Sequence, residues 1–285
     1  GYSVFTTLDG ELQTQAQQAV VRGLLAYDAR HGFRGAEMHL EGPSNDWVAA
    51  LQSISAVSGL EPAVVTRVDA QSIEVQDRNG TLIELPWEQG LRNARRYISE
   101  DYRGPAPKIA AEIAVPGDVL RIIQQEGKWR LVQVPAAQAA LVSLDATDGS
   151  IRTIVGGIDF HYSKFNRAAQ ALRQPGSNIK PFIYAAAMEN GFTPASIIND
   201  APVVFQDPGL DKVWRPENDS GKFYGPTSLR TALVNSRNLV SIRLLQQLGI
   251  PKAVDYLCNI GFSRADVPPN LSLALGTLST TPLRL

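Results

Sequence analysis

Ser177 and Lys180 are the residues of this sequence whose types and spacing most directly suggest chemistry. Ser177 follows a Pro-Gly pair and stands just before an apolar run, residues 182–188, that predicts a helix. A serine in a first helical turn lies near free backbone N–H groups and the positive end of the helix dipole, and a lysine three residues later shares its face. A buried amine at that position can lose its proton and act as the base that activates the serine. The pair therefore indicates a serine nucleophile for acyl transfer.

An alternative interpretation is that Ser177 only caps the helix and Lys180 is a solvated first-turn residue. About one Ser-x-x-Lys is expected by chance in a chain of this length, although this sequence contains no other. Ser236 and Asn238 form the only Ser-x-Asn and add a second motif. In a loop or a helix–helix joint, this serine can relay a proton and the amide can bind a substrate carbonyl. In a continuous amphipathic helix, both would instead face water.

Several stretches, taken in order, resemble the transpeptidase region of class A penicillin-binding proteins, the bifunctional peptidoglycan synthases. The two motifs carry most of the resemblance, and Arg30 to Gly35 is similar to a segment typical of the 1a subgroup. The other matching stretches are residues 2–13, 140–157, 214–218, 274–276 and 281–283. The resemblance is weakest between residues 60 and 138.

The resemblance implies a D,D-transpeptidase whose substrates are peptidoglycan stem peptides ending in D-Ala-D-Ala and which β-lactam antibiotics acylate. Ser177 would be the nucleophile and Lys180 its base, with Ser236 relaying a proton to the leaving D-alanine and Asn238 holding the substrate amide. Trp214 and Asn218 would bind substrate at the rim of the cleft. No cofactor or metal is implied.

The third motif of the family, Lys-Thr/Ser-Gly, is absent, because none of the seven lysines is followed by Thr-Gly or Ser-Gly. In the family this strand follows the Thr-x-x-Pro-Leu region and supplies one of two backbone donors of the oxyanion hole, the Ser177 N–H being the other. We therefore expect a chain truncated at both ends. A missing N-terminal part would carry a membrane anchor and a glycosyltransferase domain, at the periplasmic face of the bacterial inner membrane.

Composition excludes some other classes. A net charge of −1 argues against a general nucleic-acid binder. The single cysteine, Cys258, excludes an internal disulfide and is expected to be a buried, unreactive thiol. His31 and His39 are the nearest candidates for a metal pair, but two histidines alone indicate a site only weakly. No apolar run approaches the ~20 residues needed to span a bilayer.

The periodicity predicts a strand over residues 4–8, a helix capped by Asp9, and a second helix from Ser44 or Asn45 to Gly59. The period changes to two between Pro62 and Val134, which predicts five short strands and a small OB-like barrel. Their ranges are 64–68, 72–75, 81–85, 119–123 and 128–134.

Beyond residue 136 the pattern predicts a hairpin and then helices, over 141–145, 151–155, 181–189, 227–248 and 252–260. The expected fold class is α+β: a penicillin-binding/β-lactamase-like transpeptidase domain with an inserted, all-β, OB-like barrel. The expected division is residues 1–58 for the linker and first part of the transpeptidase domain, 59–137 for the insertion and 138–285 for the transpeptidase core.

Two other functions are open at this point. A D,D-carboxypeptidase or β-lactamase-like hydrolase would use the same serine and lysine with water as the acceptor. A non-catalytic binding module would act through the inserted barrel, which could recruit cell-wall regulatory proteins or glycan. A cluster of arginines among tyrosines is the candidate surface for nucleic acid or polysaccharide, with an ordinary solvated loop as the alternative, and nearby acidic residues count against nucleic acid. Its members are Arg92, Arg95, Arg96, Arg103, Tyr97 and Tyr102.

Overall fold

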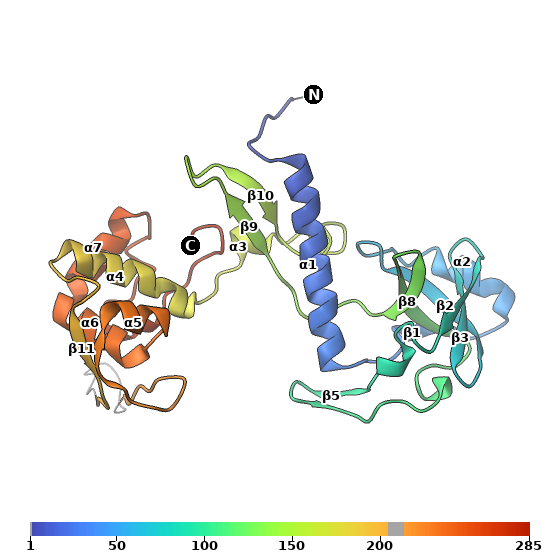
Figure 1. Cartoon of the computed structure of the whole chain (residues 1–285). Helices are drawn as coiled ribbons and strands as arrows, with labels where there is room; N and C mark the ends of the chain where they lie inside the picture. Colours follow the sequence, from blue (N-terminus) through green and yellow to red (C-terminus); the bar gives the residue numbers. More distant parts are fainter. Residues whose placement is uncertain (1, 205–213) are drawn as a thin grey trace. The chain divides into compact units, whose positions relative to one another are not determined.

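This computed structural model describes residues 2–204 and 214–285. Its first element is a long helix, α1 (Gly10–His31). The chain divides into two compact units, one up to Ala168 and one from Ala169 onward (Figure 1). The predicted cap is confirmed, because Asp9 accepts hydrogen bonds from the N–H groups of Glu11 and Leu12 at 3.0 Å each. The predicted strand over residues 4–8 is wrong, since this segment makes isolated contacts to the 151–152 backbone and no ladder.

A two-stranded hairpin packs beside α1 in the first unit. Its strands are β9 (Leu141–Leu144) and β10 (Ile151–Val155), as predicted, and the short helix α3 (Arg167–Gln170) follows them. Gln13 of α1 bonds to the free edge of β10, donating to the Ile154 carbonyl at 3.0 Å and accepting from its N–H at 2.9 Å. Val20 and Leu24 of α1 share an apolar cluster with Val155 and Ile158, which holds the hairpin against the helix.

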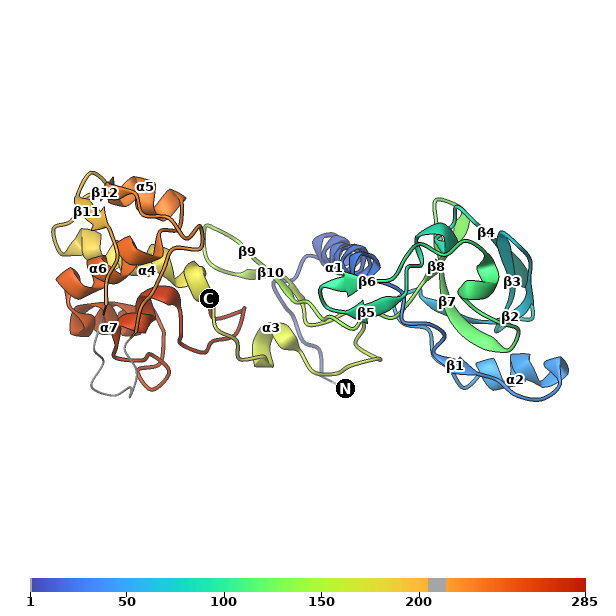
Figure 2. The ribbon, with the colours of Figure 1, turned by 90° about the horizontal axis from the view of Figure 1, so that it is seen from below.

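The OB-like region is a curved six-stranded sheet in which β7 has partners on both edges (Figure 2). It pairs with β2 on one edge and with β1 and β8 on the other, while β3 and β4 extend the sheet beyond β2. The five predicted strands are confirmed, and β1 was not predicted. The strands are β1 (Met38–His39), β2 (Glu61–Val68), β3 (Ser72–Asp77), β4 (Leu82–Pro86), β7 (Asp118–Gln125) and β8 (Lys128–Val132).

Several short elements accompany the sheet. The predicted second helix is shorter than expected: a 3-10 turn, η1 (Ser44–Asp46), leads into α2 (Trp47–Leu51), which packs on Val64 and Val119 outside the sheet. The remaining elements are η2 (Leu91–Asn93), the hairpin β5 (Tyr97–Ser99) and β6 (Tyr102–Arg103), and η3 (Ala110–Glu112). Because β1 lies before residue 59, the sheet includes chain that precedes the expected start of the insertion, and the division at residues 59 and 137 stays a prediction.

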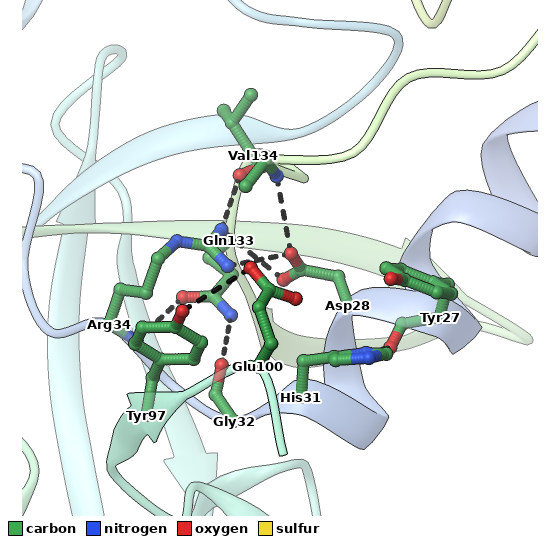
Figure 3. Close-up of polar contacts among 10 residues, drawn as sticks. Tyr27, Asp28, His31, Gly32, Arg34, Tyr97, Glu100, Gln133 and Val134 are labelled. Atoms are coloured by element: carbon green, nitrogen blue, oxygen red, sulfur yellow. Dashed lines mark hydrogen bonds and ion pairs between the residues drawn. The ribbon is translucent and has the colours of Figure 1, made fainter. Parts of the chain in front are cut away.

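The connection that enters the barrel from α1 and the connection that leaves it from β8 toward β9 meet at one polar cluster (Figure 3). Asp28 is 4% exposed and accepts a hydrogen bond from Arg34 at 2.7 Å. Gln133, on the outgoing connection, donates to the Gly32 carbonyl at 2.7 Å and accepts from the Arg34 N–H at 2.9 Å. Arg34 also donates to the Val134 carbonyl at 2.7 Å. These bonds tie the two connections to each other and to the end of α1, and we call them the connection clasp.

The second unit is a helical cluster built around α4 (Lys180–Glu189) and α6 (Asn238–Leu248). Their buried faces meet through residues such as Ile183, Ala187, Leu244 and Leu245, and Leu257 adds a contact from α7. The helix predicted over 227–248 is two helices, because the chain breaks at residues 235–237 between α5 and α6. The other elements are η4 (Gly176–Ile179), the paired strands β11 (Ile197–Asp200) and β12 (Gly225–Ser228), α5 (Leu229–Val234), α7 (Ile250–Asn259) and η5 (Leu271–Leu275).

Candidate active site

Ser177 lies in a 3-10 turn, η4, that runs directly into α4. Its side chain is exposed, whereas Ile179 in the same turn is fully buried and anchors it. The turn rests on Gly276, whose carbonyl accepts from the Gly176 N–H at 3.4 Å. A Cβ at Gly276 would lie 2.0 Å from the Gly176 carbonyl oxygen, and its φ is +74°. Only glycine fits at position 276, so this close backbone contact fixes the turn that presents the serine.

Lys180 is 1% exposed and directs its amine to three acceptors. Nζ lies 2.8 Å from the Ser236 carbonyl oxygen, 3.0 Å from Ser236 Oγ and 2.7 Å from Asn238 Oδ1. Burial lowers the pKa of Lys180 to about 8. The carbonyl and the amide oxygen can only accept, whereas the hydroxyl can also donate. The same contacts therefore suit a charged amine and also a neutral amine whose lone pair accepts from Ser236.

Ser236 lies in the joint between α5 and α6, with a positive φ of +51°. The joint is closed by two backbone bonds, from the Ser236 N–H to Leu233 at 3.0 Å and from the Arg237 N–H to Ala232 at 2.8 Å. A left-handed backbone is uncommon for a residue with a side chain. The proposed chemistry of this motif requires Ser236 to lie in a loop or a helix–helix joint. Ser236 lies in such a joint in the structure.

Asn238 begins α6 and has its amide oriented by two contacts. Its oxygen accepts from Lys180 at 2.7 Å, and its nitrogen donates to the Glu217 carbonyl at 2.9 Å. An amide nitrogen has two hydrogens. The second hydrogen is available for a substrate carbonyl.

Asn218 is buried and is hydrogen-bonded to the backbone of Asn238. Its oxygen accepts from the Asn238 N–H at 2.9 Å, and its nitrogen donates to the Lys222 carbonyl at 2.9 Å and to the fully buried carboxyl of Asp200 at 2.8 Å. These bonds use both hydrogens of the Asn218 amide. Its expected substrate contact stays a prediction, and the bonds give it a positioning role.

Trp214 is half-buried and packs against the helical core. Its expected role at the rim of the cleft also stays a prediction. Ser177, Ser236, Asn238 and Asn218 line one cavity of about 420 Å³. Four further lining residues were not predicted from the sequence: Asp219, Ser220 and Asn235, which belong to no motif, and Arg237, the variable middle position of the Ser-x-Asn motif. The guanidinium of Arg237 lies 3.4 Å from the centre of the Tyr224 ring, a cation–π contact at the edge of the cavity.

The residues considered for a metal have other contacts in the described parts of the chain. His31 stacks on Tyr27 with 4.0 Å between ring centroids, and His39 Nδ1 lies 2.9 Å from an Asp118 carboxyl oxygen. No group of three His, Cys, Asp or Glu side chains in residues 2–204 and 214–285 is arranged to hold a metal ion. Within the same residues, no helix combines the length and apolarity that crossing a membrane requires.

Comparison with known families assigns both regions of the chain. Residues 33–137 match the model of the penicillin-binding protein OB-like domain, and residues 139–272 match that of the penicillin-binding protein transpeptidase domain. The chain is 51% identical, over its whole length, to penicillin-binding protein 1A of Pseudomonas aeruginosa. The chain belongs to the penicillin-binding proteins.

Other penicillin-binding proteins support this assignment. Penicillin-binding protein 1A of Escherichia coli is 38% identical over the whole chain. The crystal structure of penicillin-binding protein 1A from Haemophilus influenzae superposes with a TM-score of 0.87 at 36% identity, covering 100% of this chain and 41% of that one. The expected fold class, a transpeptidase domain with an OB-like domain, is confirmed. The chain spans 35% of the Pseudomonas relative and 34% of the Escherichia relative.

Proposed function

We propose that this chain carries the acyl-transfer site of a D,D-transpeptidase that cross-links peptidoglycan stem peptides and that β-lactams acylate. The observation that carries the proposal is the buried amine of Lys180, which lies within hydrogen-bonding distance of Ser236 and Asn238 in the cavity that Ser177 also lines. A lysine base activates a serine nucleophile, and Lys180 follows Ser177 by three residues at the start of the same helix.

In the proposed reaction, Ser177 Oγ attacks the carbonyl carbon between the two terminal D-alanines and Lys180 takes the hydroxyl proton. The C–N bond then breaks, and Ser236 passes a proton from Lys180 to the departing amine. The Asn238 amide holds the substrate carbonyl. An amine from a second stem peptide attacks the acyl-enzyme, forming the cross-link and returning the proton and electron pair to Ser177. The reaction is an exchange of acyl acceptors and needs no cofactor.

We further propose that this chain is part of a longer protein. By analogy with relatives about three times as long, we propose a glycosyltransferase domain and a membrane anchor, with the transpeptidase at the periplasmic face of the inner membrane. We also propose that the barrel contacts cell-wall regulatory proteins or glycan, through the surface that Arg92, Arg95, Arg96 and Tyr97 provide. Nucleic acid is not a proposed partner.

The test of the nucleophile is the intact mass of the full-length protein after exposure to benzylpenicillin. We expect one covalent adduct, lost in Ser177→Ala and retained in Ser263→Ala, a control in the same unit whose hydroxyl makes no hydrogen bond within the described residues. An adduct that persists in Ser177→Ala would overturn the assignment.

A second measurement separates transfer from hydrolysis. A peptide ending in D-Ala-D-Ala is incubated with the enzyme, with and without a D-amino acid as acceptor. We expect the acceptor to become joined to the peptide. The yield of the hydrolysed peptide, which ends in a free carboxylic acid, should fall as the acceptor is added. Free acid alone at every acceptor concentration would favour the carboxypeptidase, and no turnover with either acceptor would favour the binding module.

A further inference from the structure

A second cavity lies entirely within the first unit, between α1 and the barrel. Its volume is about 410 Å³, within the range of ~300 to 1,000 Å³ typical of small-molecule sites. Residues from α1, from the η2 turn and from strands β7 and β8 line it. None of the residues of the candidate active site takes part.

Part of the cavity lining is apolar. Leu25 and Ala29 face it from α1, while Phe33, Leu131 and Val132 face it from the barrel side. Such a surface binds an apolar body of matching size because burial removes both surfaces from water.

Two of the three charged side chains in the cavity lining are basic. Arg22 of α1 and Arg130 of β8 both line the cavity, and neither makes an ion pair or side-chain hydrogen bond within residues 2–204 and 214–285. Asp28 is the one acidic residue in the lining. It is already bound by Arg34 at 2.7 Å and by the Ala136 N–H at 3.3 Å. The cavity is therefore complementary to a negative charge.

We propose that this cavity binds a small amphipathic anion, a molecule with an apolar body and one carboxylate, sulfonate or phosphate group. The apolar body lies on Leu25, Phe33 and Leu131, and the anionic group lies between the guanidinium groups of Arg22 and Arg130. Asn93 and Gln125 also line the cavity and can donate further hydrogen bonds. The proposal is independent of the transpeptidase site.

A ligand bound in this cavity would affect how α1 packs against the barrel. Asp28, Gly32 and Gln133 belong both to its lining and to the connection clasp (Figure 3). A ligand held by Arg22 and Arg130 contacts α1 and the barrel at once. Because it binds only while these two are packed together, it stabilises that packing in proportion to its occupancy.

The probe for this site is anilinonaphthalene sulfonate, which combines an aromatic body with one anionic group and becomes fluorescent in apolar surroundings. Phenyl-naphthylamine has the same aromatic body without the sulfonate and serves as the neutral comparison. We expect saturable binding of the sulfonate to the full-length protein. The double variant Arg22→Gln/Arg130→Gln should weaken it roughly tenfold or more, while affinity for the neutral dye changes less than about twofold.

Two control variants make the result specific. Arg30→Gln/Arg67→Gln removes two exposed arginines of the same unit, one on α1 and one on a barrel strand, that do not line the cavity, and it should bind both dyes as the parent does. Ala29→Trp fills the cavity and should abolish binding of both. The proposal is overturned if the sulfonate binds Ala29→Trp unchanged, or if the two arginine variants weaken it equally. Thermal unfolding of each variant shows that it is folded.

Discussion

Lys180 shows at the residue scale how burial changes the protonation of an ordinary side chain. An unperturbed lysine is almost entirely charged at neutral pH, and a charged amine cannot accept a proton. The folded protein excludes water from Lys180 and brings its pKa down to about 8. At pH 7 about a tenth of the molecules then hold a neutral amine, compared with roughly three in ten thousand for an unperturbed lysine.

The expected pH dependence follows from that pKa, since the active form is the deprotonated one. The second-order rate constant for acylation by a penicillin should rise about tenfold between pH 7 and pH 9, levelling off above the pKa. Lys180→Arg keeps the positive charge at all these pH values and should lower the rate by ~10² to 10⁴ and remove the rise. Stopped-flow acylation measures both, and a rate that stays level or falls between pH 7 and pH 9 would contradict a neutral lysine as the base.

Asn218 acts on the site through the backbone of Asn238 and its bond to buried Asp200. In Asn218→Asp two carboxyl groups face each other without a donor between them, which should cost about 2 to 5 kcal/mol of stability and slow acylation. The exchange Asp200→Asn/Asn218→Asp restores a donor between the positions while keeping an acceptor for Asn238. We expect it to recover at least half of both losses. Equal acylation rates in the parent and in a folded Asn218→Asp variant would show that Asn218 does not position the site.

At the scale of elements, the sequence pattern predicts a strand most accurately where one face of that strand is buried. Strands β3 and β4 bury every second residue, Ile73 and Val75 in one and Ile83 and Leu85 in the other. The segment at residues 4–8 has the same alternation, but Val4 and Phe5 are 81% and 95% exposed, and no strand pairs with them. Alternation alone therefore does not make a strand when no neighbouring edge supplies hydrogen bonds.

The residue types of the two candidate motifs can be read from the sequence, but their geometry could not be predicted from it. The apolar pattern over 227–248 fits one continuous helix, and the break at Ser236 depends on backbone bonds to Leu233 and Ala232 that the pattern does not encode. The two-residue strand β1 is likewise fixed by pairing with Val119, about eighty residues away in the sequence. Contacts of this range are set by tertiary packing.

Gly276 allows a test of how the η4 turn is held. A methyl group there would meet the Gly176 carbonyl oxygen at 2.0 Å, so Gly276→Ala must displace the turn that carries Ser177. We expect acylation to fall by roughly tenfold to a hundredfold. Gly149→Ala is the matched control, because its φ is also +74° but nothing lies within 4 Å of the added carbon. Both variants should lose about 1 kcal/mol of stability from the backbone conformation, and equal acylation rates in the two would contradict the role of Gly276.

At the scale of the whole molecule, the candidate site and the barrel belong to different units. Ser177, Lys180, Ser236 and Asn238 all lie beyond Ala169, whereas the barrel strands and the cavity with Arg22 and Arg130 lie before it. The proposed acyl transfer and the proposed binding by the barrel therefore depend on separate cores, and we expect that each can be altered without rebuilding the other.

Removal of the barrel tests this separation. Gln133 bonds to both Gly32 and Arg34, so the chain ends left by deleting residues 35–132 lie side by side and a short linker can join them. The deletion exposes Val20 and Leu24 of α1, which pack against Val57, Leu60 and Val132 in the intact unit. The first unit should therefore unfold at a lower temperature.

The acylation rate of Ser177 by a fluorescent penicillin should nevertheless change by less than about tenfold, or ~1.4 kcal/mol of activation free energy, because every contact of Lys180 lies in the second unit. Asp28→Asn is the companion variant. It weakens the connection clasp through the Asp28–Arg34 pair while leaving the barrel in place, and it should also leave acylation unchanged. A loss of a hundredfold or more, ~2.7 kcal/mol, in a deletion variant whose second unit is folded would mean that the barrel shapes the active site. The same loss in Asp28→Asn would trace that influence to the clasp.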